Sequence, residues 1–253
     1  MNLIKYFIFL LPILTSCQQY NSSPFDKKEA DYRKLPESYN KLLLDKLWAK
    51  RDSLTYLRFK EINTVMGEVD SLPNWIYRFN KLEDIYLTGN SEKKNKLSKE
   101  IKRLEHLKHL NLIGMNIDSL PESIYHLSEL QTINLDNNDL KLLNENISSL
   151  AKLTIISLKN NPIEAIPYSI CNLNQLKSIV LENTKISNLP SCLGGLEYLD
   201  WINVSGTQLK EFPIEILKAP KLTTIHARGL KLKNYKEVKA ICMKKNITLY
   251  YDE

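Results

Sequence analysis

The apolar positions of this chain recur with a fixed period of 23 residues. Leucines spaced in this way stand at Leu107, Leu130, Leu153, Leu176, Leu199 and Leu222. Each is followed by an L-x-L segment in which apolar and polar residues alternate, which predicts a short strand with one buried and one exposed face. A period of this length indicates a chain built by stacking one supersecondary unit, not by folding around a single globular core.

The clearest unit, LKHLNLIGMNIDSLPESIYHLSE, begins at Leu107. Upstream the period lengthens: the unit at Leu82 has 25 residues, and the unit at Leu54 has 28. Leu222 opens a last, degenerate unit, and the segment ITLYY from Ile247 reads as a closing strand. The sequence therefore predicts eight units followed by a terminal strand.

Two further residue types mark each unit. An Asn follows the strand at Asn90, Asn138 and Asn161, where its amide can both donate to and accept from backbone groups of a buried turn. Thr184 and Thr207 can do part of this work, but Met115 and Leu230 cannot. A proline begins the return segment at Pro73, Pro121, Pro167, Pro190 and Pro213. Because proline fixes φ and lacks an N–H, it favours extended or one-turn helical structure there.

The units follow the pattern L-x-x-L-x-L-x-x-N-x-L-x-x-L-P-x-x-I-x-x-L-x-x, and in this they resemble the 23-residue class of the leucine-rich repeat family. The resemblance implies an α/β leucine-rich repeat solenoid, a curved right-handed superhelix. A parallel sheet would line its concave face, and extended or short helical segments its convex side. It also implies that the array binds other proteins, as such arrays usually do.

An array of this kind needs a cap at each end, because the terminal units expose an apolar flank. Residues 31–53 form the predicted N-terminal helical cap, since Glu37 to Arg51 place apolar side chains at helical spacing. Residues 54–253 hold the repeats and the C-terminal cap. That second cap comprises a helix from Asn234 to Lys245 and the closing strand.

The first 16 residues have the layout of a secretory signal: Lys5, then an apolar stretch too short to span a bilayer. The segment Leu14-Thr15-Ser16-Cys17 resembles the bacterial lipoprotein box, which implies lipid on Cys17, and the open alternative is an ordinary signal with an incidental cysteine. Residues 17–30 are polar and aperiodic, as in a flexible tether. By the sorting rule of the lipoprotein family, Gln18 after the cysteine argues against retention in the inner membrane. We therefore expect a bacterial envelope protein of the outer membrane, with its array facing either the periplasm or the exterior.

Charge and cysteine content limit the partners and the covalent structure. The formal net charge is +6, modest for 253 residues, and no nucleic-acid partner is predicted. Cys171 and Cys192 lie 21 residues apart, two short of the period. With units about 5 Å apart and two extended residues adding roughly 6 Å, their Cα atoms should be about 8 Å apart. This exceeds the usual limit of about 7 Å, so free thiols are expected over a disulfide.

No catalytic, cofactor or metal site is predicted. The four histidines lack a Cys or carboxylate partner at ligand spacing. The run from Asp136 to Asp139 lacks the Gly and Glu of a calcium loop, and Gly194-Gly195 does not directly follow a strand as a phosphate-binding loop would. The expectation is a non-catalytic protein without a cofactor.

The concave surface remains as the candidate site. Its predicted partner-binding residues, taken from the outward positions of the strands, are Tyr56, Arg58, Tyr86, His109, Asn111, Asn134, Asp136, Glu182, Trp201, Asn203, His226 and Arg228. Exposed Trp and Tyr are enriched in binding hot spots, which favours a protein or peptide ligand. Carbohydrate binding or adhesion is the alternative, since Asn side chains can bond sugar hydroxyls, although the aromatic residues are expected to lie too far apart to form one platform.

Overall fold

The computed structural model describes residues 56–58, 74–89 and 94–252, with backbone alone for residues 56–58, 74 and 75. The predicted signal (1–16), tether (17–30) and N-terminal cap (31–53), and with them Cys17, lie outside these residues. Asn90 and Pro73 lie outside them too.

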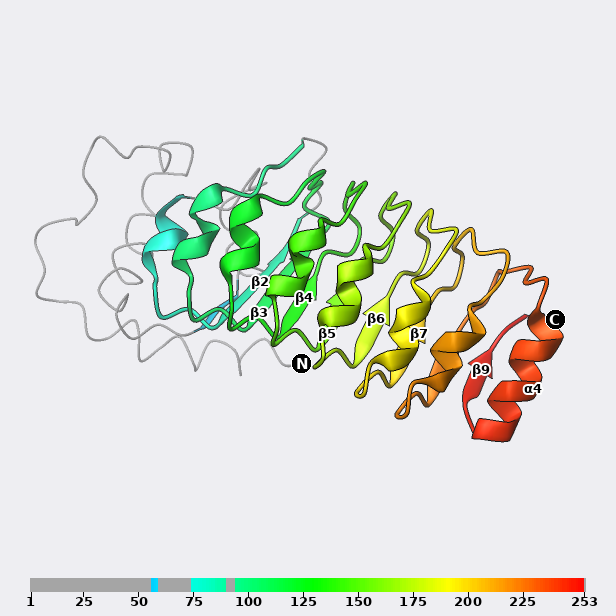
Figure 1. The fold of residues 1–253 in the computed structure, drawn as a ribbon. Coiled ribbons are helices and arrows are strands. Elements are labelled where there is room, and N and C mark those ends of the chain that lie inside the picture. The colour runs from blue at the N-terminus through cyan, green and yellow to red at the C-terminus, as the bar shows by residue number, and fades with distance from the viewer. Residues whose placement is uncertain (1–55, 59–73, 90–93, 253) are drawn as a thin grey trace, which may run out of the picture.

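Nine strands form one parallel sheet in which spatial order follows sequence order. The strands are β1 (Tyr56–Arg58), β2 (Asp84–Thr88), β3 (His109–Ile113), β4 (Thr132–Asn134), β5 (Ile155–Ser157), β6 (Ser178–Val180), β7 (Trp201–Asn203), β8 (Thr224–His226) and β9 (Thr248–Tyr250). Figure 1 shows them side by side in a long, gently curved array. The eight units and terminal strand expected from the period are confirmed, and so is the α/β solenoid.

A second row of short helices covers the other side of the array (Figure 1). Seven are 3-10 helices: η2 (Asn74–Arg78), η3 (Lys99–Arg103), η4 (Glu122–His126), η5 (Glu145–Ser149), η6 (Tyr168–Asn172), η7 (Ser191–Gly195) and η8 (Ile214–Lys218). The N-cap residue of η4, η6, η7 and η8 is in each case a proline with extended backbone, as predicted. These prolines thus set where the return segment begins to turn.

The core lies between the sheet and the row of helices. Leu110 and Leu112 of β3 are completely buried, and so are Ile124 and Leu127 of the following return segment. The same positions are buried in the neighbouring units, so the repeated aliphatic positions join into one continuous apolar cluster. Stacking is therefore what removes the apolar flanks of each inner unit from water.

Two of the predicted asparagines, Asn138 and Asn161, make the backbone hydrogen bonds predicted for them. Asn161 donates from Nδ2 to the carbonyls of Leu135 and Leu158 at 2.8 and 3.0 Å, and its Oδ1 accepts from the Leu140 N–H at 3.0 Å. Asn138 repeats this pattern one unit earlier. Thr184 makes one such bond, from Oγ1 to the Leu181 carbonyl at 2.8 Å. The Asn side chains therefore bridge adjacent units through buried backbone groups.

The C-terminal end of the array holds helix α4 (Tyr235–Lys245) and strand β9, the elements that the sequence predicts there. Val238 and Cys242 of α4 are buried, and the ring of Tyr235 stacks on that of Tyr251 with centroids 4.1 Å apart. The helix ends at Asn246, whose left-handed backbone (φ 58°) allows its N–H to bond the last carbonyls.

The expectation of free thiols at Cys171 and Cys192 is wrong. The structure joins them in a disulfide with a Cα–Cα distance of 5.9 Å. Both lie in 3-10 helices, η6 and η7, where the rise is about 2 Å per residue instead of the roughly 3 Å of an extended chain. The two-residue offset therefore adds only about 4 Å, which brings the Cα atoms within disulfide range.

Candidate functional site

The concave face of the sheet presents the outward side chains of strands β2 to β9 in two columns. The parallel register aligns Asp84, His109, Thr132, Ile155, Ser178, Trp201, Thr224 and Thr248 in the first column. It aligns Tyr86, Asn111, Asn134, Ser157, Val180, Asn203, His226 and Tyr250 in the second. Residues far apart in the chain are thus neighbours on a rigid surface.

Three aromatic rings meet over the last three strands. The rings of Trp201 and His226 are edge to face with centroids 5.7 Å apart, and those of His226 and Tyr250 are tilted with centroids 4.4 Å apart. Tyr250 is 40% exposed, and Trp201 and His226 are partly exposed. We name Trp201, His226 and Tyr250 the aromatic row. The wide spacing expected for the concave aromatic residues therefore does not hold at this end of the sheet.

Charged groups border the aromatic row. The guanidinium of Arg228 lies 5.6 Å from the centre of the Tyr250 ring, within cation–π range. Burial, followed by the positive charge of Arg228, lowers the pKa of His226, while the Glu182 carboxylate opposes this shift. His226 is therefore neutral near pH 7 and contributes an uncharged ring to the row.

A chain of polar contacts crosses the middle strands. Asp136 Oδ1 accepts from Ser157 Oγ at 2.6 Å and from the Lys159 N–H at 2.9 Å. Lys159 Nζ lies 2.7 Å from Glu182 Oε1, and this bond is the main reason that the pKa of Glu182 is lowered. Asn203 Nδ2 then donates to Glu182 Oε2 at 3.0 Å. Asp136 and Glu182, both predicted contact residues, are thus fixed in place but remain partly exposed.

Asn203 corrects the prediction made for it. It is only 5% exposed, and its Oδ1 accepts from the Ser205 N–H at 3.0 Å while its Nδ2 is bonded to Glu182. Its amide is consumed by neighbours, so it positions Glu182 instead of facing a ligand. Ser157, Ser178 and Val180, also at outward positions, are buried as well.

The remaining predicted residues lie toward the N-terminal end of the sheet. Tyr86, Asn111 and Asn134 are consecutive in the second column and partly exposed, and His109 is exposed beside them. Asn134 Oδ1 is bonded to the Asp136 N–H at 2.9 Å. Tyr56 and Arg58 form part of β1, but their side chains lie outside the described residues. Four strands lie between β2 and β7, so Tyr86 and Trp201 do not form one contact patch.

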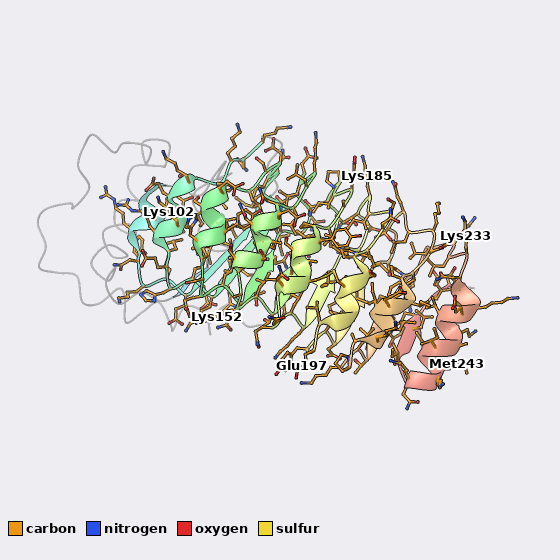
Figure 2. All side chains as sticks on the ribbon, in the orientation of Figure 1. Lys102, Lys152, Lys185, Glu197, Lys233 and Met243 are labelled. Atoms are coloured by element: carbon orange, nitrogen blue, oxygen red, sulfur yellow. A yellow bond between two sulfur atoms is a disulfide. The ribbon has the colours of Figure 1, made fainter. Side chains whose placement is uncertain are left out.

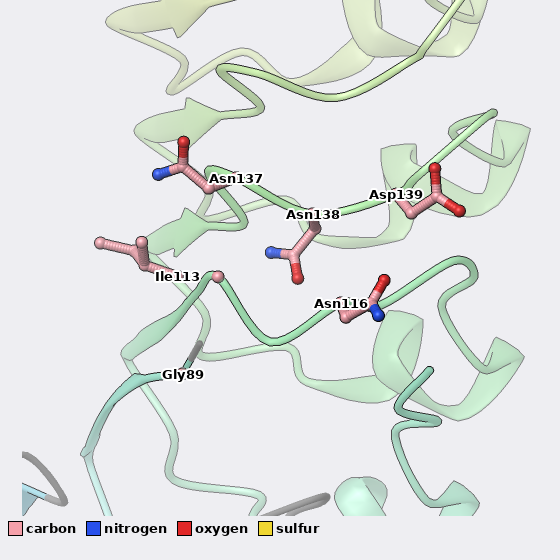
Figure 3. A pocket seen from close by; sticks show the side chains of 7 residues that line it. Gly89, Ile113, Asn116, Asn137, Asn138 and Asp139 are labelled. Atoms are coloured by element: carbon pink, nitrogen blue, oxygen red, sulfur yellow. The ribbon is translucent and has the colours of Figure 1, made fainter. Parts of the chain in front are cut away.

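A polar pocket of about 530 Å³ opens where the strands of units two to four turn away from the sheet (Figure 3). Its lining consists of Gly89, Ile113, Gly114, Asn116, Asn137, Asn138 and Asp139. Asn138 is already bonded to backbone carbonyls, and residues 90–93, which follow Gly89, lie outside the described part of the chain. The Asn138 amide therefore serves the turn, not a ligand in the pocket.

Asparagines form a ladder along this edge that the sequence reasoning missed. Asn160 Nδ2 donates to Asn137 Oδ1 at 2.6 Å, and Asn183 Nδ2 donates to Asn160 Oδ1 at 2.9 Å. All three have left-handed backbone, with φ between 54° and 57°, which Asn tolerates better than most residues. Their 23-residue spacing was the signal that could have revealed the ladder. Tyr250 was also missed, although extending the outward positions into the terminal strand places it beside His226.

Within the described ranges, no group of three or more His, Cys, Asp or Glu side chains is placed to hold a metal ion. The described helices also include none with the length and apolar character needed to cross a membrane. The aromatic row with Arg228 and Glu182 is thus the most developed cluster of exposed binding groups on the concave face.

Comparison with known proteins agrees with this architecture. The leucine-rich repeat region model matches residues 58–169, and the leucine rich repeat model matches residues 144–209. Among curated protein sequences, none matches this chain.

Several solved structures are similar in fold. One is the ectodomain of the plant membrane receptor kinase GASSHO1/SCHENGEN3 from Arabidopsis thaliana, in complex with Casparian strip integrity factor 2, with 26% identity, a TM-score of 0.56 and coverage of 64% of this chain and 20% of that one. Another is the plant peptide hormone receptor RGFR1 in complex with RGF2, with 22% identity, a TM-score of 0.52 and coverage of 64% and 27%. An internalin from Listeria monocytogenes has 17% identity, a TM-score of 0.53 and coverage of 70% and 58%.

The chain spans between 20% and 58% of the length of these solved structures. Leucine-rich repeats generally serve as protein interaction modules, typically without catalysis, and their stacking creates extended concave surfaces. The period, the parallel sheet, the bridging asparagines and the two model matches agree, and the chain belongs to the leucine-rich repeat proteins.

Proposed function

We propose that this chain is a non-catalytic, lipid-anchored recognition protein of a bacterial envelope, which binds a protein or peptide on its concave sheet. The aromatic row is the observation that carries the binding part of the proposal. Trp and Tyr supply much of the energy of protein interfaces, and here the rings of Trp201 and Tyr250 each contact the ring of His226 on a rigid surface, with Arg228 beside Tyr250. Nine strands at about 4.8 Å span roughly 43 Å, which accommodates a standard interface.

The similar plant receptors support this choice of partner class. One is described as a peptide hormone receptor in complex with RGF2, and the other is in complex with Casparian strip integrity factor 2. Their low identity to this chain carries over no residue of those interfaces. We therefore place the main contact at the aromatic row from the geometry of this chain, with Glu182 and Arg228 selecting polar groups beside it.

The envelope location is proposed from the N-terminal sequence and supported by the disulfide. The lipoprotein-like segment ending at Cys17 implies a lipid anchor, and Gln18 after it favours the outer membrane. Disulfides persist in oxidising compartments such as the periplasm and the cell surface, so the Cys171–Cys192 pair fits an exported body. The lipid part has a direct test: Cys17→Ala should move the protein from the membrane fraction to the soluble fraction, and retention in membranes contradicts anchoring at Cys17.

The binding part is tested in two steps. Crosslinking in native envelopes followed by mass spectrometry identifies the partner, and its affinity is then measured for variants. Trp201→Ala and Tyr250→Ala should each weaken binding by about 2 kcal/mol, or roughly 30-fold, as at interface hot spots. Tyr168→Ala is the matched control, because Tyr168 is 72% exposed but lies on η6, on the opposite side of the array. Unchanged affinity in both concave variants would show that the ligand binds elsewhere.

Carbohydrate binding is the second candidate, and the aromatic row is the observation that favours it. Aromatic faces stack on sugar rings, and Thr224, which is paired with Trp201 in the register, offers a hydroxyl beside the row that can bond a sugar hydroxyl. A glycan array probed with the full chain separates the two functions. A sugar-specific signal that Trp201→Ala abolishes would favour carbohydrate, whereas a partner protein with no glycan dependence would favour the first function.

A further inference from the structure

The modest net charge of the chain conceals a strong asymmetry. Residues 218–245 contain eight Lys and one Arg but a single carboxylate, Glu237, which gives this stretch a charge of +8. The whole chain carries 35 basic and 29 acidic residues, so the remaining residues carry 26 and 28 and sum to −2. The excess positive charge of the protein is thus confined to its C-terminal end.

Helix α4 and the loop before it bring these lysines onto one surface. Positions 236, 239, 240, 243 and 244 share one side of the helix, because they follow its 3.6-residue period. All five are exposed, whereas Val238 and Cys242 on the opposite side are buried. Lys231 and Lys233 stand exposed at the start of the helix. We name Lys231, Lys233, Lys236, Lys239, Met243 and Lys244 the basic end face; Figure 2 labels Lys233 and Met243 on it.

Four of these lysines lack the carboxylate partners that lysines have elsewhere in the described part of the array. Lys108, Lys152 and Lys159 each lie within 3 Å of a glutamate oxygen. In contrast, no carboxylate of the described residues forms an ion pair with Lys231, Lys233, Lys236 or Lys244. Met243 lies among them with 71% of its surface exposed. The end face therefore combines uncompensated positive charge with one projecting apolar side chain.

We propose that the basic end face docks on an anionic lipid surface. Lysine ammonium groups are attracted to lipid phosphates at a membrane surface, and an exposed apolar side chain such as Met243 can enter the headgroup region. A nucleic acid would use the lysines but would give Met243 no apolar environment. Because α4 is the last helix of the array, docking through it leaves the concave face open (Figure 1). This inference depends neither on the concave ligand nor on lipid at Cys17.

Lysine footprinting on the full chain tests the proposal directly. The protein is acetylated at lysines in the presence of phosphatidylcholine vesicles with or without phosphatidylglycerol, and each site is quantified by mass spectrometry. We expect acetylation of Lys233, Lys236 and Lys244 to fall severalfold only with the anionic vesicles and to recover at high salt. Lys102 and Lys185, exposed and away from α4 (Figure 2), serve as internal controls. Equal labelling of the end face on both vesicle types overturns the proposal.

Two further arms separate lipid from other polyanions and from loss of folding. Lys233→Glu/Lys236→Glu/Lys244→Glu should weaken binding to the anionic vesicles roughly tenfold or more, since each lysine near such a surface contributes measurably. The charge-matched control is Lys102→Glu/Lys141→Glu/Lys185→Glu. If this control loses as much vesicle binding, the end face is not the membrane-binding site. The corresponding Gln variants repeat the comparison should a Glu variant fail to fold. The same footprinting is repeated with duplex DNA. If the DNA protects the end-face lysines from acetylation as strongly as the anionic vesicles do, and if Met243→Ser changes neither the DNA result nor the vesicle result, the face binds polyanions in general and the membrane proposal is overturned.

Discussion

Cys171 of η6 and Cys192 of η7 form a disulfide that ties two neighbouring units together on the convex side, with their Cα atoms 5.9 Å apart. The residues lie 21 positions apart in the chain, so the bond closes a short loop. Stacking of the two units therefore has a covalent support at one point, in addition to the shared apolar core.

Reduction of this disulfide should lower stability. In the chain-entropy model a loop of this length corresponds to about 3 kcal/mol, because the oxidised unfolded chain has fewer conformations available. Urea unfolding of the wild-type protein with and without reductant measures the effect. The Cys171→Ser/Cys192→Ser variant should unfold near the reduced wild type and show no response to reductant. A wild-type midpoint that reductant leaves unchanged would contradict the pairing.

Asn161→Ala should be strongly destabilising. The variant leaves the Leu140 N–H and the Leu158 carbonyl without their buried partner, whereas the Leu135 carbonyl keeps its bond from Asn138. Since each buried group left unpaired costs about 1–3 kcal/mol, a loss of about 3 kcal/mol or more is expected. Chemical denaturation gives the value, and Asn188→Ala is the control because its exposed amide bonds only the adjacent Ser187 hydroxyl. Equal stability of the two variants would refute the bridging role.

The glycine pair of η7 offers a matched comparison at adjacent positions. A Cβ atom on Gly194 would lie 2.0 Å from the Glu215 carbonyl oxygen, whereas one on Gly195 would meet nothing within 4 Å. Gly194→Ala should therefore force η7 away from η8 at a cost of about 1–3 kcal/mol. Gly195→Ala should be neutral or stabilising by about 0.4–1 kcal/mol, because it restricts the unfolded chain. Thermal and urea unfolding measure the stability of both variants. A Gly194→Ala variant more stable than Gly195→Ala would contradict the close approach of η7 to the Glu215 carbonyl.

Acidification should weaken the C-terminal end of the sheet through His226. Its pKa lies below the ordinary 6.5, so the unfolded state binds the proton more readily than the folded state. The folded protein therefore loses stability as the pH falls below 6.5 toward the lowered pKa. The lowered pKa of Glu182 adds a second loss only below its own ordinary value of 4.5.

Wild type and His226→Gln separate this effect from the rest of the titration. Their unfolding free energies are compared at about pH 8 and about pH 5.5, on either side of the ordinary histidine pKa. The difference between the two proteins should shift in favour of the variant at the lower pH. A wild type that gains stability relative to His226→Gln on acidification would show that the histidine is better accommodated as a cation.

Most of the fold was predictable because the residues of each repeat determine its own strand, turn and return segment. The L-x-L alternation specifies a strand, the bridging Asn specifies the turn after it, and proline specifies where η4, η6, η7 and η8 begin. The strand order also follows, since a unit can bury its flank only against its sequence neighbour. The outward positions of the concave face follow from the same alternation.

Exposure within those positions was less predictable. Asn203 occupies an outward position but is buried, with its Nδ2 bonded to Glu182 of the neighbouring unit and its Oδ1 to the Ser205 N–H of its own unit. The aromatic row needed the register of three strands, including β9, whose Tyr250 lies beyond the last full repeat. The relative sizes of side chains on neighbouring strands decide which groups reach solvent. The repeat period of the sequence gives the position of each side chain but not how its size compares with that of its neighbours in space.

The sequence alone determined the repeat, the number of strands, their parallel order and the residues that face inward, since these follow from local periodicity and from the need to cover each apolar flank. The tertiary structure decided the contacts across units: the disulfide, the asparagine ladder, the aromatic row and the basic end face. Each depends on distances of a few ångströms between neighbouring turns of the solenoid, which helical rise and side-chain packing set only once the units are stacked.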